Sequence, residues 1–260
     1  MSARVKTRVE TPPRPRHRVF VSAAAVRGAR VVIEARETLH HLVRVLRVAT
    51  GEWLICCDGQ GGEVAGPIVS SGPMQLTVEI IERREKVGGG TGCWLIQALP
   101  KSDRFEWILQ KATELGVERI TPVLTERTVV RLDAARAQAK QARWRRIVQE
   151  AAEQSQRATI PELDPVQSFD ALLKRLPTSG LVLLPTLATT AVPLRTLIES
   201  SPHAAEVAVL IGPEGDFSLE EVQRAQAHGA RPVSLGSLTL RSETAALAAL
   251  AILRYALGCS

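Results

Sequence analysis

The sequence predicts an α/β protein with a parallel sheet, preceded by a smaller β-rich domain. Short alternating apolar runs separated by turn residues occupy residues 18–86, whereas buried-strand patterns alternate with helical patterns from residue 93 onward. Strands that alternate with helices form parallel sheets, and ligands bind beyond the carboxyl ends of such strands. We therefore expect a basic flexible arm at residues 1–17, a small β-barrel at 18–86, a linker at 87–92 and the α/β domain at 93–260.

The β-rich region contains two turn signals and one helical patch. Asp58-Gly59 and Gly61-Gly62 separate two apolar runs and are typical of a hairpin. The stretch "TLHHLVRVLRV" places its leucines on one face of a short helix. The glycines of "VGGGTG" sustain neither helix nor strand, which indicates a linker between the two domains.

In the second region, five strands and five helices are predicted from hydrophobic periodicity. The strands fall at 93–99, 118–125, 180–185, 206–213 and 231–236, and the helices at 103–115, 134–156, 169–176, 219–228 and 244–256. Two helix starts carry the spacing of a capping box, Asp103 with Glu106 and Ser218 with Glu221. Each pair is expected to satisfy the first backbone N–H groups of its helix.

Charge and cysteine content narrow the class of protein. The net charge is +6, and residues 1–50 hold 11 Lys and Arg against 3 Asp and Glu, whereas the other 210 residues hold 22 against 24. A basic end on a near-neutral body favours a polyanionic partner, although a solvated tail explains it as well. The four cysteines form neither a disulfide framework nor a metal-binding pattern. No apolar run is long enough to span a membrane, so we expect a soluble cytoplasmic protein without metal.

Three strand-to-helix junctions in the last third are rich in Gly, Pro and small polar residues: 184–187, 211–216 and 235–242. If their strands are neighbours, these loops converge on one crevice. "GPEGD" is a poor phosphate cradle, because Glu214 and Asp216 repel polyphosphate and no Walker lysine follows. It is also a poor Rossmann fingerprint, since that motif follows the first strand. Taken alone, it could be only a tight turn.

The turn is not alone, because "IGPEGDFSLEEV" is followed by "LGSLTLRSETAALAALAIL". Together they resemble the family of ribosomal RNA small subunit methyltransferase E, which belongs to the SPOUT class of knotted methyltransferases. The blocks "HHLVRVLRV", "TGEWLICCDGQGGEV", "DRFEWILQKATELGVERITPVLTERTV", "RWRRIVQEAAEQSQR" and "IPEL" resemble the same family in the same order. The resemblance therefore covers nearly the whole chain. The chain departs from it where Ser102, Gln156 and Asp216 replace common glycines.

The resemblance implies a PUA-like RNA-binding barrel, a parallel sheet with a C-terminal trefoil knot, and a homodimer. It further implies methyl transfer from S-adenosylmethionine to N3 of one uridine in small-subunit (16S) ribosomal RNA, which is expected to be met in the assembled subunit. The cofactor-binding residues that it implies are Leu184, Pro185, Thr186, Ile211, Gly212, Pro213, Glu214, Gly215, Leu235, Gly236, Ser237, Leu240, Arg241, Thr244 and Ala245.

Two residues of these loops are candidates for the chemistry. We expect Arg241 to stabilise the negative charge that develops on uracil, although it could instead brace the loops through Glu214 or Glu243. Glu214 is a candidate general base. RNA contacts are expected from the basic residues Arg16, Arg18, Arg44, Arg47, Lys101, Arg104, Lys111 and Arg127.

Two other functions stay open from the sequence. A knotted methyltransferase could act on another RNA, either at a tRNA base or at a ribose 2′-hydroxyl. A non-enzymatic assembly factor could bind ribosomal RNA through the basic N-terminal region, although "GPEG" and "LRSETA" are both intact.

Overall fold

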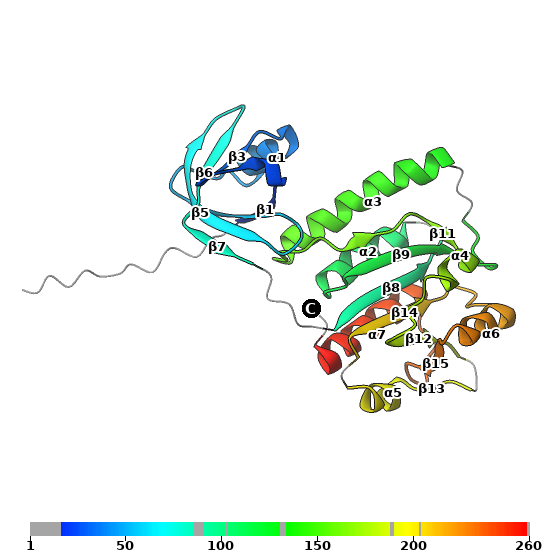
Figure 1. Ribbon diagram of the computed structural model, residues 1–260. Coiled ribbons are helices and arrows are strands. Elements are labelled where there is room, and N and C mark those ends of the chain that lie inside the picture. The colour runs from blue at the N-terminus through cyan, green and yellow to red at the C-terminus, as the bar shows by residue number, and fades with distance from the viewer. Residues whose placement is uncertain are drawn as a thin grey trace, which may run out of the picture. The chain divides into compact units, whose positions relative to one another are not determined.

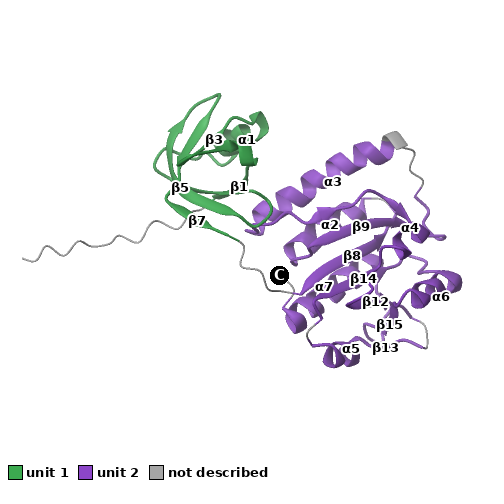
Figure 2. Cartoon of the chain, viewed as in Figure 1, with its two compact units in different colours: residues 1–86 green, residues 87–260 purple. Residues whose placement is uncertain are grey.

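The computed structural model describes residues 17–85, 91–101, 103–130, 134–187, 190–202 and 204–258 (Figure 1). The chain divides into two compact units, residues 1–86 and 87–260 (Figure 2). Residues 1–16 of the expected arm lie outside the described ranges, and His17 already belongs to the first strand, because it pairs with Leu54. Across the described residues, no helix combines the length and apolar character that a membrane crossing requires.

Unit 1 is built on one mostly antiparallel sheet, and only β1 and β4 run parallel. Its order is β1-β4-β5-β6-β3-β2, and β7 pairs with β5. The strands are β1 (His17–Phe20), β2 (Val26–Arg27), β3 (Arg30–Ile33), β4 (Trp53–Cys57), β5 (Glu63–Ser71), β6 (Leu76–Glu79) and β7 (Glu82–Arg84).

The predicted hairpin of unit 1 is confirmed between β4 and β5. Asp58 closes its turn by accepting hydrogen bonds from the backbone N–H groups of Gln60, at 2.7 Å, and Gly62, at 3.0 Å. The predicted helical patch is also present, as α1 (Arg36–His40) continued by a π-helical turn (His41–Val45). Leu39 and Leu42 are buried there, because they pack in the same core as the sheet residues.

Unit 2 contains the predicted parallel sheet, with the order β10-β9-β8-β14-β12-β15-β13 and with β11 beside β9. Every pairing in it is parallel. Its strands are β8 (Gly92–Ala98), β9 (Arg119–Leu124), β10 (Glu162–Leu163), β11 (Gln167–Ser168), β12 (Leu181–Pro185), β13 (Val192–Pro193), β14 (Glu206–Ile211) and β15 (Arg231–Ser234). Gly92, expected in the linker, belongs to β8 because it pairs with Glu206.

Helices cover both faces of this sheet (Figure 1). Val207, Val209 and Ile211 of β14 share a core with helices α2, α3, α5 and α7, whereas Ala208 and Leu210 share the other core with α4 and α6. This alternation is what a strand buried on both sides requires. The helices are α2 (Arg104–Glu114), α3 (Ala134–Gln154), α4 (Phe169–Leu173), α5 (Leu194–Ser200), α6 (Leu219–Ala227) and α7 (Ser242–Leu257).

Of the two predicted capping boxes, one is confirmed and one is wrong. Ser218 and Glu221 form both reciprocal bonds at the start of α6. Asp103 makes no side-chain cap for α2, because its ψ of 13° departs from the extended conformation of a capping residue. Glu106 instead accepts a 2.7 Å hydrogen bond from Arg143 of α3.

Candidate active site

Three loops meet at the carboxyl edge of the parallel sheet, as the sequence predicts. They follow β12, β14 and β15, which are neighbours in the order β14-β12-β15. Together they enclose a cavity of about 280 Å³, close to the lower limit of roughly 300 Å³ for small-molecule sites. Its walls come from the ends of these strands, from the loops and from the first turn of α7: Pro185, Thr186, Leu187, Ile211, Gly212, Pro213, Glu214, Asp216, Ser234, Leu235, Gly236, Leu238, Thr239, Leu240, Arg241, Ser242 and Ala245.

Most of the residues expected at a cofactor lie in these walls, but four do not. Leu184 is fully buried in the core beneath, since it belongs to β12 itself. Gly215, Ser237 and Thr244 are exposed outside the cavity. The predicted cofactor-binding residues also omit six that line it: Leu187, Asp216, Ser234, Leu238, Thr239 and Ser242. They lie next to predicted residues in the chain, so extending each motif by one or two positions would have found them.

A buried chain of hydrogen bonds fixes the loop after β14 to its neighbours. Ser242, at the start of α7, donates from Oγ to the carbonyl of Gly212 at 2.6 Å. Gln97 of β8 donates in turn from Nε2 to Ser242 Oγ at 2.9 Å, and also to Ala98 O. A buried carbonyl without a donor is costly, so this chain stabilises the loop in one conformation.

The far side of the same loop is anchored through Glu221, which is buried at the start of α6. Its Oε2 accepts from Ser218 N at 3.0 Å, and its Oε1 accepts from Glu126 N at 2.9 Å, in the loop after β9. Arg127, the next residue, donates from Nη1 to Gly215 O at 2.7 Å. Two adjacent residues of one loop therefore hold the segment between β14 and α6.

Asp216 is the lining residue with the least common backbone conformation. Its φ is +58°, a left-handed value that glycine adopts freely and that Asp tolerates better than most residues. Gln156, the second described position where a common family glycine is replaced, has a φ of +62°. The Oδ1 atom of Asp216 accepts from Phe217 N at 2.8 Å, and Oδ2 accepts from the Thr186 hydroxyl at 3.1 Å.

Glu214 is engaged by the segment that follows β8. Its Oε1 accepts from Lys101 N at 3.0 Å and from Arg104 Nη1 at 3.4 Å. Arg104 also lies 3.9 Å from Glu243 Oε2 at the start of α7. The brace considered for Arg241 is therefore supplied by Arg104, which bridges both acidic residues.

Arg241 precedes α7, is exposed and lines the cavity. Within the described residues its guanidinium forms no hydrogen bond or ion pair. A guanidinium in the cavity wall is thus available to a ligand.

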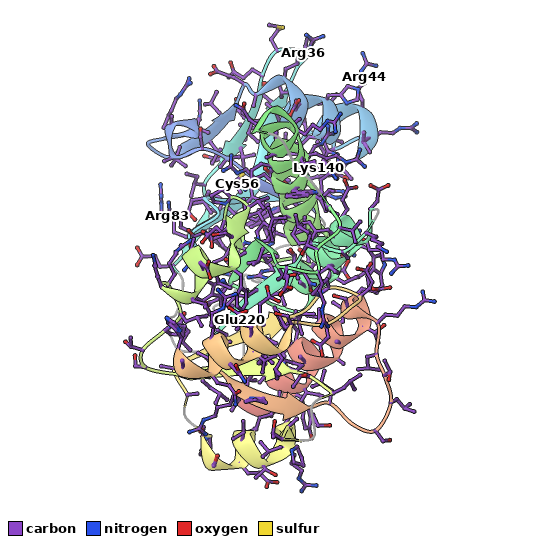
Figure 3. The ribbon with its side chains drawn as sticks, turned by 90° about the vertical axis from the view of Figure 1, so that its right-hand side faces the viewer. Arg36, Arg44, Cys56, Arg83, Lys140 and Glu220 are labelled. Atoms are coloured by element: carbon purple, nitrogen blue, oxygen red, sulfur yellow. The ribbon has the colours of Figure 1, made fainter. Side chains whose placement is uncertain are left out.

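The other residues expected at RNA are placed very differently. Arg44 is exposed on the π-helical turn of unit 1, and Arg47 is exposed just after it; Figure 3 labels Arg44 and Arg36, which is exposed at the start of α1. Arg18 is instead largely covered, and its Nη1 donates to Cys57 Sγ at 3.0 Å and pairs with Glu63. The Arg18 guanidinium is therefore engaged within unit 1.

In unit 2, the expected RNA-binding residues are partly engaged as well. Lys111 forms a 2.8 Å ion pair with Glu114 along α2, while Arg104 and Arg127 hold the loop after β14. Lys101 has an exposed side chain beside them. Arg16 lies outside the described residues.

Comparison with known proteins agrees with this architecture. The family described as "RNA methyltransferase domain" matches residues 91–254, and "RNA methyltransferase PUA domain" matches 33–81. The chain is 33% identical over 224 residues to ribosomal RNA small subunit methyltransferase E of Bacillus subtilis, covering 84% of this chain and 88% of that one. It is 34% identical over 238 residues to the Synechocystis protein of the same name, with coverage of 90% and 76%.

Two solved structures with S-adenosylmethionine bound are similar over nearly their full length. One is a putative methyltransferase from Legionella pneumophila, with 34% identity, a TM-score of 0.81 and coverage of 92% of this chain and 97% of that one. The other is ribosomal RNA small subunit methyltransferase E from Neisseria gonorrhoeae, with 31% identity, a TM-score of 0.82 and the same coverage. By its sequence, its PUA and methyltransferase domains and its parallel sheet, the chain belongs to the ribosomal RNA small subunit methyltransferase E family.

Proposed function

We propose that this protein uses S-adenosylmethionine to methylate N3 of a specific uridine in small-subunit ribosomal RNA. The observation that carries the proposal is the cavity at the carboxyl edge of β12, β14 and β15, in a chain of this family. Two relatives of similar fold are solved with S-adenosylmethionine bound.

The residues that line the cavity fit this cofactor. Loop segments with Gly212 and Gly236 leave backbone groups accessible to a heterocycle, while Pro185, Leu235 and Leu240 supply apolar walls. A side chain at Gly212 would crowd this turn, because an added Cβ would lie 3.0 Å from Asp216 Oδ1. The walls also carry two carboxylates, Glu214 and Asp216, and one guanidinium, Arg241. When bound, the cofactor supplies an electrophilic methyl group.

Arg241 is the residue to which we assign charge stabilisation. Uridine N3 becomes nucleophilic when it loses its proton, and the negative charge then spreads onto the neighbouring carbonyl oxygens. A preorganised guanidinium beside those oxygens stabilises the anion more than the neutral base, which lowers the barrier. The described structure leaves the Arg241 guanidinium without an internal partner, and this supports the assignment.

To Glu214 we assign a positioning role. Its Oε1 already accepts two hydrogen bonds, from Lys101 N and from Arg104. This oxygen would have to give up one of them to accept a proton as a base, and losing a hydrogen bond is unfavourable. Glu214 thus joins the segment after β8 to the cavity loop, and proton transfer to water is the route we propose.

The RNA is held by exposed cations, in our proposal. Arg44 and Arg47 lie on unit 1, which matches the PUA family, and Lys101 lies beside the cavity loop. Phosphate contacts of this kind give an affinity that falls steeply with salt concentration. The preferred form of the RNA is the assembled small subunit, in the cytoplasm.

We further propose that the protein is a homodimer and that its last segment threads a trefoil knot. An exposed apolar face of α7 supports dimerisation, since Ile252 is 40% and Tyr255 94% exposed in the single chain. The 211–216 and 235–241 segments, which resemble the two knot loops of the family, line the same cavity.

Mass spectrometry of ribosomal RNA nucleosides tests the function directly. Cells that lack this protein should lose one 3-methyluridine from small-subunit RNA, and the wild-type gene should restore it, whereas an Arg241→Ala gene should not. An unchanged nucleoside profile would refute the proposal. Loss of a different methylated nucleoside would favour another RNA target, and full restoration by Arg241→Ala would contradict the role assigned to this guanidinium.

A further inference from the structure

Asp216 is a carboxylate in the cavity wall with no cation assigned to it. Asp216 lies in the loop between β14 and α6. Its φ of +58° is a conformation that glycine would adopt with less strain. The unfavourable backbone conformation of Asp216 indicates that its side chain has a role at this position.

Its hydrogen bonds orient it toward the cavity and leave acceptor capacity. Oδ1 accepts from Phe217 N at 2.8 Å, and Oδ2 accepts from Thr186 Oγ1 at 3.1 Å. Thr186 and Asp216 both line the cavity, from the ends of two neighbouring strands. A carboxylate offers about four lone-pair sites, so two bonds leave room for a ligand donor.

The charges around the cavity identify the kind of donor. Glu214 is paired with Arg104, at 3.4 Å, whereas Asp216 has no ion pair with any residue in the described part of the chain. The third charged residue of the wall is Arg241, which lines the same cavity without such a pair to Asp216. A carboxylate in a largely apolar wall is stabilised most by a ligand group that is both cationic and a hydrogen-bond donor.

We infer that Asp216 binds the α-ammonium group of the methionine moiety of the cofactor. The ammonium group carries positive charge and three N–H donors, whereas the sulfonium has charge but no donor and the ribose hydroxyls have donors but no charge. Asp216 is thereby a specificity-determining residue for amino-acid-bearing cofactors. The inference rests on the proposed use of S-adenosylmethionine and is independent of which RNA base is methylated.

Calorimetric titration with three ligands tests it. S-adenosylmethionine carries all three groups, and S-adenosylhomocysteine lacks only the sulfonium. 5′-Methylthioadenosine lacks both the sulfonium and the amino-acid chain with its ammonium group, so S-adenosylhomocysteine controls for the missing sulfonium. Asp216→Asn keeps the size of the side chain, tolerates the left-handed backbone and removes the charge. We expect it to weaken the first two ligands by a similar factor of at least roughly 10, and to leave 5′-methylthioadenosine unchanged.

Asp216→Gly provides the second variant, because glycine adopts this φ without strain and offers no side chain. It should show the same selective losses, and the Tm of both unliganded variants should establish that the fold is intact. Equal weakening of all three ligands, weakening of S-adenosylmethionine alone, or no weakening would each overturn the inference. If the wild-type chain bound no S-adenosylmethionine, both the proposed function and the inference about Asp216 would fail. If the wild-type chain binds it and the variants show no selective loss, only the inference fails.

Discussion

Arg104 Nη1 lies 3.4 Å from Glu214 Oε1 and 3.9 Å from Glu243 Oε2, so one guanidinium joins the start of α2 to the cavity loop and to the start of α7. Lys101 N reinforces this link at 3.0 Å from the same Glu214 oxygen. Glu214, the candidate general base, and Glu243 are thus both held by the segment after β8. This relationship is open to a direct test.

Glu214→Gln should slow methyl transfer by less than about 10-fold. Glutamine keeps an oxygen that accepts from Lys101 N and loses only the charge, whereas removal of a general base typically slows a reaction by roughly 10² to 10⁴-fold. Single-turnover transfer of a radiolabelled methyl group measures the rate. Glu220→Gln, a change of the exposed α6 residue labelled in Figure 3, is the matched control and should leave the rate at its wild-type value. A fall of more than about 100-fold in Glu214→Gln would instead assign the base to Glu214.

Arg241→Ala should lower the rate of methyl transfer by about 10² to 10³-fold, the effect of losing one preorganised charge-stabilising donor. Affinity for S-adenosylmethionine should stay within a factor of about 2, because the guanidinium acts on the developing charge of the base. Rapid-quench transfer and calorimetry measure the two quantities separately. Arg241→Lys, which restores a cation without its planar fork, should recover part of the rate. A wild-type rate in Arg241→Ala would contradict the assignment.

Ser242→Ala should destabilise the protein by about 1–3 kcal/mol, because Gly212 O loses its buried donor and Gln97 Nε2 loses an acceptor. Urea unfolding followed by circular dichroism measures the free energy of unfolding. Ser237→Ala, in the exposed part of the 235–241 loop, is the paired control and should change stability by less than about 0.5 kcal/mol. Equal effects of the two substitutions would show that the buried chain contributes nothing specific.

Arg18→Ala and Arg44→Ala should separate stability from RNA binding. Arg18→Ala leaves Glu63 without its partner and should lower the free energy of unfolding by about 1–3 kcal/mol. Arg44→Ala removes an exposed cation, so it should leave stability unchanged and reduce the dependence of RNA affinity on salt. Fluorescence anisotropy with a small-subunit RNA fragment at several salt concentrations measures the second effect. A loss of salt dependence in Arg18→Ala with unchanged stability would reverse our placement of these residues.

The thiols of unit 1 should make the fold sensitive to high pH. Burial raises the pKa of Cys56 to about 12, with a further contribution from Cys57. Burial also raises the pKa of Cys57, to about 11, although Arg18 opposes this shift. Both folded values exceed the ordinary value of 9.0, so the unfolded chain binds fewer protons above that pH.

Because the unfolded chain binds fewer protons in this range, the free energy of unfolding falls as pH rises. Stability from these thiols is fully present below pH 9 and is lost as pH rises through about 11 and 12. Unfolding at pH 8 and at pH 10.5 should therefore show a lower free energy at the higher pH, and Cys56→Ser with Cys57→Ser should reduce that difference. Iodoacetamide should react slowly with both thiols at pH 8. Rapid reaction without unfolding would contradict the burial.

The sequence predicts five strands, five helices and three Gly- and Pro-rich loops of unit 2 because each rests on local periodicity and turn chemistry. It misses α5 and the two-residue strands β10, β11 and β13, which are too short for a periodic pattern. Ser218 and Glu221 illustrate the role of local pattern, since their spacing predicts the cap that the structure shows. Asp103 and Glu106 have the same spacing and form no cap, because Arg143 of α3 engages Glu106. A partner 37 residues away is invisible to a local pattern.

At the site as well, the sequence does not predict hydrogen bonds and ion pairs between side chains that are far apart in the chain. Arg18 and Arg44 look alike in a basic N-terminal sequence, yet one pairs with Glu63 on β5 and the other is exposed. The hydrogen bond from Thr186 to Asp216 likewise joins residues 30 positions apart. Such contacts depend on the order β14-β12-β15, which periodicity does not determine.

Glu221 has one more consequence. Its carboxylate accepts hydrogen bonds from Ser218 N and Glu126 N, and Arg127 donates one to Gly215 O. These bonds hold the segment between β14 and α6 in one conformation before any ligand binds. A preformed wall spares the binding reaction the entropy of ordering that segment. The cofactor then binds to a preformed surface on this side of the pocket, and its affinity reflects its contacts with that surface.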